Sequence, residues 1–292
     1  MTPPRVVVVG DVCTDVVALL AGAPAPGSDR PAAITTRGGG AGANVAAHLA
    51  ALGTPVLLAG SVGDDLPGQA LCRELADGGV TLAVRTVPGA ATGTIVSLVE
   101  PDGERSMLAD RGANLALQPT DVPVPPPGGH LHLSGYTLLD AGPRRAGLAA
   151  LAAAREAGCT VSVDPASTGP LAGYGVSRWL ADTAAATLLL PNADEARLLT
   201  GATDPARAAR ALARRYPVVV VTLGAEGALW AAGDVLVHRP AHPADVVDTT
   251  GAGDAFTAGV LSVWTAGRPD PVEALEAGLR RAAAVVGRTG AR

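Results

Sequence analysis

The most informative absence in this 292-residue sequence is lysine. All 22 basic side chains are arginine, and with 27 acidic side chains they give a formal net charge of −5. Enzymes that need an amine at a fixed position are therefore excluded, because P-loop enzymes and protein kinases place a lysine on the phosphates and Schiff-base enzymes use one as nucleophile. A phosphate site in this chain has to use arginine, backbone N–H groups, helix N-termini or a metal ion.

Cysteine, aromatic residues and long apolar runs are also scarce. Cys13, Cys72 and Cys159 lie far apart and form no C-x-x-C pair, which predicts neither a disulfide framework nor a zinc site. Three Trp, three Tyr and one Phe, with no basic cluster, argue against a nucleic-acid partner. The first apolar run, residues 6–9, is interrupted at once by Gly10-Asp11. We interpret it as a buried strand and expect a cytoplasmic protein with no membrane partner.

Short runs rich in β-branched residues alternate with alanine-rich segments of helical length. We predict strands at residues 6–9, 55–59, 130–133, 160–163, 187–190 and 218–222, and helices at residues 41–52, 65–77, 143–157, 193–200, 204–215, 251–266 and 271–287. This alternation predicts one α/β domain over residues 1–292, with a mainly parallel central sheet between two helical layers. Ligands of such sheets bind beyond the carboxyl ends of the strands.

Two segments interrupt this alternation. Residues 11–37 contain prolines and no helical period, whereas residues 94–100 and 105–109 flank a Pro101-Asp102-Gly103 turn, as in a β-hairpin. We predict that these inserted segments, 11–37 and 90–111, pair into a small β-sheet that acts as a lid over the ligand edge. Exposed edges and apolar residues in such a sheet also predict a homodimer formed through the lid.

The most specific motif is Asp248-Thr249-Thr250-Gly251-Ala252-Gly253-Asp254-Ala255-Phe256, where a strand-like pair of valines runs into a glycine turn and an alanine-rich helix. N–H groups that converge at a helix N-terminus form an anion hole without lysine. Asp254 lies in the first helical turn, beside the position where negative charge would develop. The alternative is that this acid only complements the helix terminus.

The motif resembles a signature of the PfkB, or ribokinase-like, carbohydrate kinase family, and four other segments agree with it in the family's order. Residues 10–15 resemble the sugar-binding turn, residues 37–44 the glycine motif, residues 192–195 the NxxE motif and residues 222–227 the nucleotide-site loop. The terminal segment 282–291 also fits the family's closing helix. The resemblance covers essentially the whole chain.

The resemblance implies a ribokinase-like three-layer fold and an ATP-dependent sugar kinase. Asp254 would be the general base, and the N–H groups of Gly251, Ala252 and Gly253 would form the anion hole. Mg²⁺ would be held through water by Glu195. The remaining implied residues are Asp15, Gly39, Gly40 and Asn44 for the sugar, Asn192, Glu195, Thr222, Gly224 and Gly227 for the nucleotide, and Asp248 and Thr250 near a monovalent cation such as K⁺.

The residues leave the substrate open. Compared with ribokinases, Cys13 replaces a usual asparagine and Ala41 a usual lysine, which argues against ribose. Arg111 adjoins the turn at residues 112–114, and we predict that it contacts the substrate, where it would suit the carboxylate of a sugar acid or the phosphate of a sugar phosphate. A nucleoside kinase of the same fold and a non-catalytic sugar-binding regulator are the alternatives.

Three further polar residues have two interpretations each. His130 and His132 alternate on one strand, where a packed pair is favoured over a metal site, and Asp164 ends a strand as either a site residue or a turn former. Residues 38–43 match a dinucleotide fingerprint in part. Because they do not follow the first strand directly, a Rossmann dehydrogenase is not expected.

Overall fold

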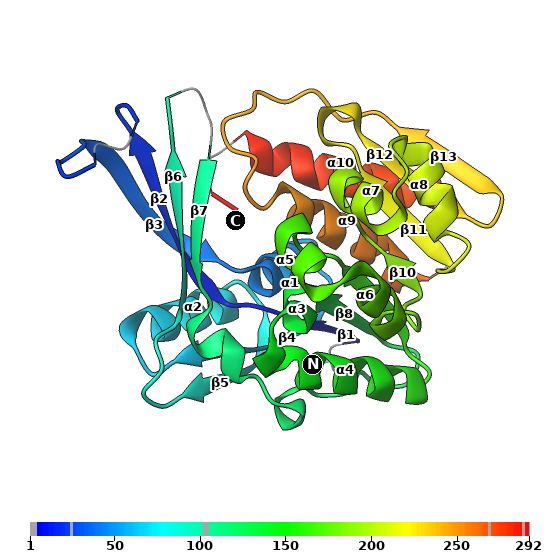
Figure 1. Cartoon of the computed structure of the whole chain (residues 1–292). Helices are drawn as coiled ribbons and strands as arrows, with labels where there is room; N and C mark the ends of the chain where they lie inside the picture. Colours follow the sequence, from blue (N-terminus) through cyan, green and yellow to red (C-terminus); the bar gives the residue numbers. More distant parts are fainter. Residues whose placement is uncertain (1–4, 24–25, 102–104, 268–269, 288–289, 292) are drawn as a thin grey trace.

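The structure is a computed structural model that describes residues 5–23, 26–101, 105–267, 270–287 and 290–291, and its strands form two sheets (Figure 1). The strands are β1 (Val6–Val9), β2 (Cys13–Leu20), β3 (Ala32–Gly39), β4 (Val56–Gly63), β5 (Thr81–Val87), β6 (Gly93–Val99), β7 (Arg105–Asp110), β8 (His130–Ser134), β9 (Thr160–Asp164), β10 (Leu188–Leu189), β11 (Val218–Thr222), β12 (Ala228–Ala232) and β13 (Val235–Arg239). The helices are α1 (Ala41–Ala51), α2 (Leu66–Asp77), α3 (Tyr136–Leu139), α4 (Ala141–Glu156), α5 (Thr168–Tyr174), α6 (Val176–Asp182), α7 (Ala193–Thr200), α8 (Pro205–Leu212), α9 (Ala252–Ala266) and α10 (Pro271–Val286), with 3₁₀ turns η1 (Gly112–Ala116), η2 (Pro119–Asp121) and η3 (Gly224–Glu226).

The nine-stranded sheet forms the body of the molecule, in the order β13-β12-β11-β10-β9-β8-β1-β4-β5. Its strands pair in parallel from β11 to β5, and β12 and β13 extend one edge in antiparallel fashion. The strand β1 is buried on both faces: Val7 and Val9 pack into one helical layer, and Val6 and Val8 into the other. An uninterrupted valine run is what such a strand requires, because successive side chains point to opposite faces.

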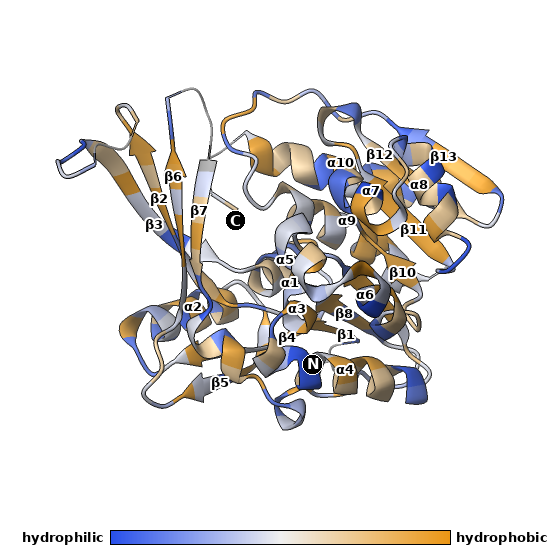
Figure 2. Ribbon diagram, in the orientation of Figure 1, coloured by the Kyte–Doolittle hydropathy of each residue, from blue (hydrophilic) through white to orange (hydrophobic). Residues whose placement is uncertain are grey.

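Helices cover both faces of this sheet. One core cluster joins it to α4, α6, α7 and α8, and a second cluster on the opposite face joins it to α1, α2, α9 and α10. Apolar colouring is concentrated in inner strands such as β1 and β8 (Figure 2). The predicted three-layer α/β fold is therefore confirmed. Within the described residues, no helix combines the length and the apolar character needed to cross a bilayer.

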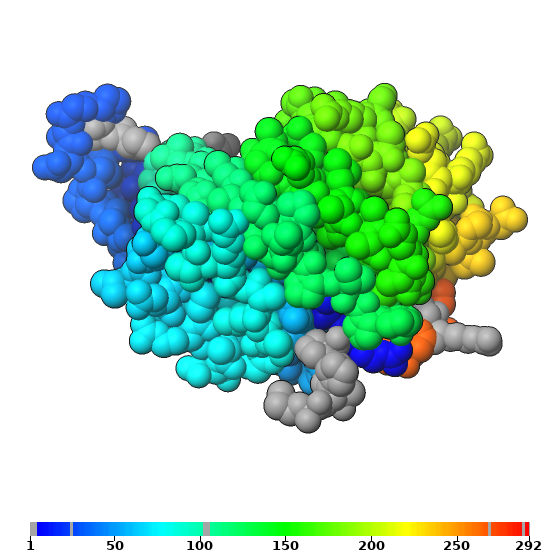
Figure 3. All heavy atoms as spheres, turned by 90° about the horizontal axis from the view of Figure 1, so that it is seen from below, coloured from blue at the N-terminus to red at the C-terminus, as the bar shows by residue number. Residues whose placement is uncertain are grey.

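The second sheet is small and is built from the two inserted segments. Its order is β3-β2-β6-β7, with β2 antiparallel to β3 and parallel to β6, and β6 antiparallel to β7. The blue β2–β3 hairpin projects from the body of the molecule (Figure 3). Because β2 begins at Cys13, shortly after β1 ends, this sheet starts at the carboxyl edge of the body. A separate small sheet is confirmed, and its action as a lid stays a prediction.

Several elements differ from the sequence-based expectations. The strand β4 continues to Gly63 instead of ending at residue 59, because pairing with β5 compensates for the weak strand propensity of its glycines. The pattern missed β5, β12, β13, α3, α5 and α6. All of these except the seven-residue strand β5 are short or rich in glycine and alanine. The helix α10 ends at Val286, so segment 282–291 is helical only in its first part, and residues 288–289 lie outside the described residues. Asp102 and Gly103 of the predicted turn also lie outside them.

Candidate active site

A pocket opens at the carboxyl ends of β9, β10 and β11, against the first turns of α7 and α9. Figure 1 labels these strands and helices. This is the edge at which parallel α/β sheets bind ligands. The pocket brings together predicted residues from three separate motifs of the sequence. Its lining consists of Asp164, Ala166, Leu190, Asn192, Glu195, Val220, Thr222, Gly253, Asp254, Phe256 and Thr257.

The glycine turn before α9 supplies helix-terminal N–H groups to this pocket. Gly251 is the N-cap and has a φ of 75°, and a Cβ at this position would collide with Ala291. The N–H of Ala252 donates to the Thr249 carbonyl at 3.2 Å, at the long end of the hydrogen-bond range. Within the described residues, the N–H groups of Gly251 and Gly253 have no backbone acceptor. The turn therefore presents donors that an anion can accept.

Asp254 is joined to the glycine motif of α1 by a side-chain hydrogen bond. Asn44 Nδ2 donates to Asp254 Oδ2 at 2.8 Å, across 210 positions of sequence. Asn44 is only 4% exposed, and its Oδ1 atom is buried without a hydrogen-bond partner among the described residues. The contact orients the carboxylate, and the amide oxygen is a buried acceptor whose hydrogen-bonding capacity is unused among the described residues.

Asp15, Gly39 and Gly40 continue from Asn44 toward the small sheet. The Asp15 carboxyl group lies directly against Gly39, and a Cβ on Gly39 would overlap it. Gly40 has a φ of 92°, and a Cβ at this position would overlap the carbonyl of Asp11, so both the conformation and the space require glycine. Its own carbonyl accepts the N–H of Asn44 at 2.9 Å, so the predicted sugar-binding residues are connected through short backbone steps.

Asn192 and Glu195 bond to each other at the start of α7. The Asn192 side chain accepts the N–H of Glu195 at 2.9 Å, and the Glu195 carboxylate accepts the N–H of Asn192 at 2.8 Å, which is a capping box. Glu195 is 4% exposed. Burial raises its pKa to about 7 against the opposing hydrogen bonds from Asn192, and the nearby charge of Asp164 adds to the rise. Helix capping alone accounts for the pair, so its role toward a metal stays a prediction.

The nucleotide-site loop divides into a pocket residue and a turn. The N–H of Thr222 donates to the Pro191 carbonyl at 3.1 Å, which aligns Thr222 with Asn192 at the pocket wall. Gly224 begins the turn η3 that follows and Gly227 comes directly after it, and a 2.8 Å bond from Leu223 N–H to the Gly227 carbonyl closes the loop. These two glycines do not line the pocket.

Asp248 and Thr250 are tied to the end of the chain. The buried Asp248 carboxylate accepts the N–H of Thr250 at 2.9 Å through Oδ1 and the N–H of Gly290 at 3.0 Å through Oδ2. The side chain thus fixes the turn before α9 against the C-terminal segment. A monovalent cation here would need backbone carbonyls as ligands, and this site stays a prediction.

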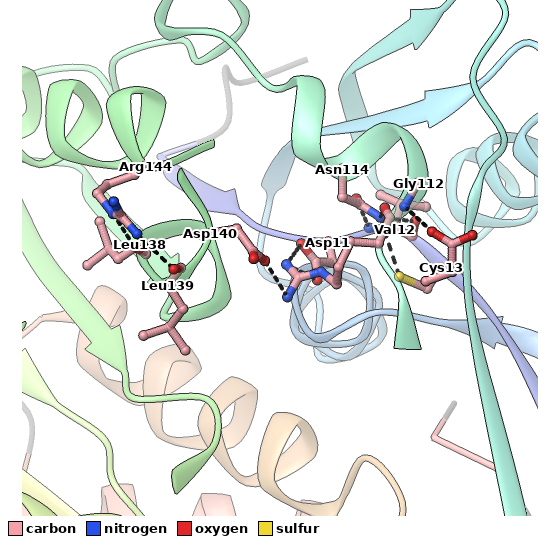
Figure 4. A network of polar contacts seen from close by, with 11 residues as sticks. Asp11, Val12, Cys13, Gly112, Asn114, Leu138, Leu139, Asp140 and Arg144 are labelled. Atoms are coloured by element: carbon pink, nitrogen blue, oxygen red, sulfur yellow. Dashed lines mark hydrogen bonds and ion pairs between the residues drawn. The ribbon is translucent and has the colours of Figure 1, made fainter. Parts of the chain in front are cut away.

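Arg111 lies between two carboxylates beyond the end of β1, those of Asp11 and Asp140, which Figure 4 labels. Its guanidinium contacts Asp11 Oδ2 at 2.6 Å and Asp140 Oδ2 at 3.2 Å, and stacks on the Tyr136 ring at 4.6 Å. Burial raises the pKa of the Asp11 carboxyl group, and Arg111 opposes that rise. Two carboxylates therefore compensate the charge that sequence reasoning assigned to a substrate anion.

Asn114 holds the same region from the other side. Its Oδ1 accepts the N–H of Val12 at 2.9 Å, and its Nδ2 donates to the carbonyls of Val12 and Arg111 at 3.0 Å each (Figure 4). The same amide lies 3.4 Å from the buried Cys13 thiol, whose pKa is raised by burial. Asn114 thus holds the backbone at Val12, directly before the start of β2, by hydrogen bonds from both ends of its amide.

Sequence reasoning missed Ala166 and left Asp164 undecided. Both line the pocket. Ala166 has a φ of 73° and is the only non-glycine residue with a positive φ in the described part of the chain. The only signal was an Asp-Pro pair at the end of a predicted strand. His130 and His132 bond to Ser162 inside the sheet, and no group of three potential metal ligands occurs among the described residues.

The fold and site define a phosphotransferase with an alcohol acceptor: a carboxylate stands beside helix-terminal N–H groups, at the ligand edge of a three-layer α/β fold. Comparison with known protein families identifies the family to which the chain belongs. The chain belongs to the pfkB family carbohydrate kinases, whose family model matches residues 3–292.

Three relatives illustrate the range of this family. The chain is 36% identical to a fructokinase of Klebsiella pneumoniae over 81% of its own length and 80% of the relative's. It is also 36% identical to an ATP-dependent ribose-1-phosphate kinase of Halopiger xanaduensis, covering 91% of this chain and 87% of that one. A Vibrio cholerae fructokinase crystallised with fructose, ADP and calcium superposes with a TM-score of 0.84 at 27% identity, covering 99% and 94% of the two chains. Carbohydrate or nucleoside kinase activity that depends on ATP is therefore supported, whereas the substrate is not fixed.

Proposed function

We propose that this protein transfers the γ-phosphate of Mg²⁺-ATP to a hydroxyl group of a neutral sugar, with Asp254 as the general base. The observation that carries the proposal is the 2.8 Å hydrogen bond from Asn44 to Asp254. It joins the predicted sugar-binding motif to the predicted base at the mouth of the pocket. A hydroxyl that contacts Asn44 Oδ1 would lie beside the Asp254 carboxylate.

The described residues divide the reaction between positioning and charge stabilisation. Asp254 accepts the proton of the attacking hydroxyl, while Asn44 fixes the orientation of the carboxylate. The N–H groups of Gly251 and Gly253 stabilise negative charge on the transferred group, as phosphoryl transfer requires. The sugar is held by Asn44, Asp15 and the backbone of Gly39 and Gly40.

The pocket wall opposite α9 suits a nucleotide with its divalent cation. Asn192, Thr222 and the buried Glu195 offer oxygen atoms, which are the ligands that Mg²⁺ and its bound waters prefer. When bound, Mg²⁺ would neutralise charge on the phosphates. Asp248 and Thr250 would shape the carbonyl ring of a monovalent cation site, for which a dependence of the turnover rate on K⁺ is the direct test.

A neutral sugar is favoured because Arg111 is already compensated. Its contacts with Asp11 and Asp140 leave no net positive charge for a sugar acid or a sugar phosphate. Tyr136, which could stack on a nucleobase, is covered by the same guanidinium. These contacts argue against the sugar-phosphate and nucleoside alternatives.

An ADP-release assay with Mg²⁺ and K⁺ tests the proposal. Fructose or another neutral sugar should support turnover better than fructose 6-phosphate, ribose 1-phosphate, sugar acids or nucleosides, and the replacements at Cys13 and Ala41 predict that ribose is a poor substrate. Sugar binding without ADP release across the whole panel would support the non-catalytic regulator instead. Preferred turnover of a phosphorylated sugar would contradict the assignment to Arg111.

The substitution Asp254→Asn tests the base. It keeps the size of the side chain but removes the proton acceptor, so kcat should fall by about 10²–10⁴-fold. Asp234→Asn, in the exposed turn between β12 and β13, is the matched control and should keep the wild-type rate. If Asp254→Asn is correctly folded by circular dichroism and turns over normally, Asp254 is not the base.

We also propose that the small sheet closes over the sugar and pairs with a second copy, and that the protein acts in the cytoplasm. Ile34 on β3 and Met107 and Leu108 on β7 are 60–65% exposed, which is unusual for large apolar side chains. A dimer would cover them. Light scattering should give a dimer for the wild type and a monomer for Met107→Glu, and a monomeric wild type would contradict this proposal.

A further inference from the structure

A chain of polar side chains runs through the interior of the main sheet and ends at the pocket. It begins at Trp264 on α9, whose Nε1 donates to Thr160 Oγ1 at 3.3 Å. Thr160 contacts His130 Nδ1 at 2.8 Å, and His130 Nε2 contacts Ser162 Oγ at 2.8 Å. Ser162 then contacts His132 Nδ1 at 2.9 Å. Both histidines and Ser162 are at most 2% exposed, so these groups bond to one another in place of water.

The last link of this chain is His132 Nε2. Asp164 Oδ2 lies 3.4 Å away, farther than an ordinary N–H···O hydrogen bond, and no other acceptor among the described residues reaches this buried nitrogen. A buried ring nitrogen without a partner is costly, and Asp164 is the group nearest to this one among the described residues; because a carboxylate only accepts, the contact requires a proton on Nε2. Asp164 also lines the pocket that holds Asp254 and Glu195.

The carboxylate end of the chain determines its direction, and the indole end is compatible with it. An indole can only donate, and a carboxylate can only accept. If His132 Nε2–H points to Asp164, the neutral ring must accept at Nδ1, and Ser162 must be the donor there. Ser162 in turn accepts from His130 Nε2–H, and His130 Nδ1 accepts from Thr160, which accepts from Trp264. Every group then has one consistent role, and both histidines are neutral Nε2–H tautomers.

The neutrality of His130 is independently favoured. Burial lowers the pKa of His130 to about 3. A charged His130 would need a counter-ion inside the sheet, and its two ring nitrogens contact only hydroxyl groups.

The backbone around Asp164 is fixed as well. A Cβ on Gly135 would overlap the Asp164 carbonyl, so the end of β8 and the end of β9 are in close contact. Ala166, two residues further on, is held in the left-handed region at a φ of 73°. Such backbone conformations persist only where the surroundings impose them, and they concentrate at functional sites. Side chain and backbone therefore both restrict Asp164.

We propose that His132 is a positioning residue of the kinase reaction: its Nε2–H holds the Asp164 carboxylate at the pocket wall, and the chain from Trp264 selects the tautomer that makes this contact possible. The kinetic part rests on the proposed function, because it assumes turnover in this pocket. The tautomer part does not.

The tautomers are tested first, by ¹⁵N–¹H correlation spectra of the ¹⁵N-histidine-labelled protein at neutral pH. The whole protein contains only five histidines, so the spectra of His130→Gln and His132→Gln suffice to assign the signals of these two rings. Both rings should carry their proton on Nε2. A His132 ring protonated on Nδ1 alone would reverse the direction of the chain, and a ring protonated on both nitrogens would show that the chain does not select a neutral tautomer; either result would overturn the proposal.

The kinetics are tested by a pair of substitutions at His132. His132→Leu removes the donor and should lower kcat by about tenfold or more, with little change in the KM of the sugar. His132→Gln can place an amide donor near the lost Nε2–H and should restore part of the rate. Equal rates for wild type and His132→Leu, or equal losses for Leu and Gln, would show that His132 only fills space.

Cutting the chain one link earlier provides a matched control. Ser162→Ala removes the donor that fixes His132, and it should lower kcat and allow the Nδ1–H tautomer of His132. Ser61→Ala on β4 removes an equally buried hydroxyl that has no partner among the described residues, and it should keep the wild-type rate. If both variants behave alike, the chain does not act on the site. If the wild type shows no turnover with any substrate, the proposed function fails, and the spectra still decide the direction of the chain.

Discussion

We predict that the buried negative charge of Glu195 lowers the stability of the fold but is needed for catalysis. The substitution Glu195→Gln should therefore change stability and turnover rate in opposite directions. Glutamine keeps the shape of the side chain and can still accept the N–H of Asn192, so the capping box at the start of α7 is preserved. It cannot carry the negative charge that we propose for organising the waters of Mg²⁺. We expect a variant with a higher unfolding free energy at alkaline pH and a lower kcat.

The magnitude follows from the raised pKa of Glu195. Burial moves this pKa from 4.5 to about 7, which corresponds to about 3 kcal/mol at about 1.4 kcal/mol per pKa unit. Because the folded pKa is the higher one, the folded state binds the proton more tightly than the unfolded state. The favourable contribution is fully present below pH 4.5 and is lost as the pH rises through about 7. Glutamine does not titrate, so the unfolding free energy of the variant does not lose this contribution as the pH rises.

Urea unfolding of both proteins between pH 5 and pH 8 measures the effect. The unfolding free energy of Glu195→Gln minus that of the wild type should increase with pH by up to about 3 kcal/mol. Glu273→Gln is the control, because Glu273 occupies the same third position of α10 but is exposed, and its difference should stay flat. A flat difference for Glu195→Gln would refute the reasoning from burial.

Two backbone positions give further predictions. Gly251→Ala should lower the unfolding free energy by about 1–3 kcal/mol and should also lower kcat. The reasons are the φ of 75° at this position and the contact of the new methyl group with Ala291. Wild-type stability of this variant in urea unfolding would contradict the prediction. Ala166→Gly should raise the unfolding free energy by about 1 kcal/mol, because glycine relieves the φ of 73° at a smaller cost in unfolded-chain entropy. Destabilisation in the same assay would show that the Ala166 methyl group packs better than its backbone strain costs.

The individual motifs were predictable because each is a local pattern. The glycine turn before Asp254, the Asn192–Glu195 spacing and the valine strand β1 all follow from residue types at fixed separations. The strands β5, β12 and β13 were not predictable in this way. They are stabilised by pairing at the sheet edges, which local propensity does not report.

Arg111 shows where reasoning from residue types stops. An arginine beside a glycine turn in a kinase suggests an anionic substrate, and nothing near it in the sequence points to Asp11 or Asp140. Those carboxylates come from the end of β1 and the start of α4, and only the fold places them on the guanidinium. The same applies to His132 in the middle of β8 and Asp164 at the end of β9, which come within 3.4 Å because the two strands are neighbours in the sheet.

The sequence by itself determined the family, the α/β class and the chemistry of an anion hole without lysine, since these depend on composition and on short motifs. The tertiary structure decided which charges compensate each other and which carboxylates share a pocket. It joined Asn44 to Asp254 across 210 residues and connected Trp264 to Asp164 through the core. The reason is physical: a carboxylate acts according to its burial and its partners, and the fold sets both.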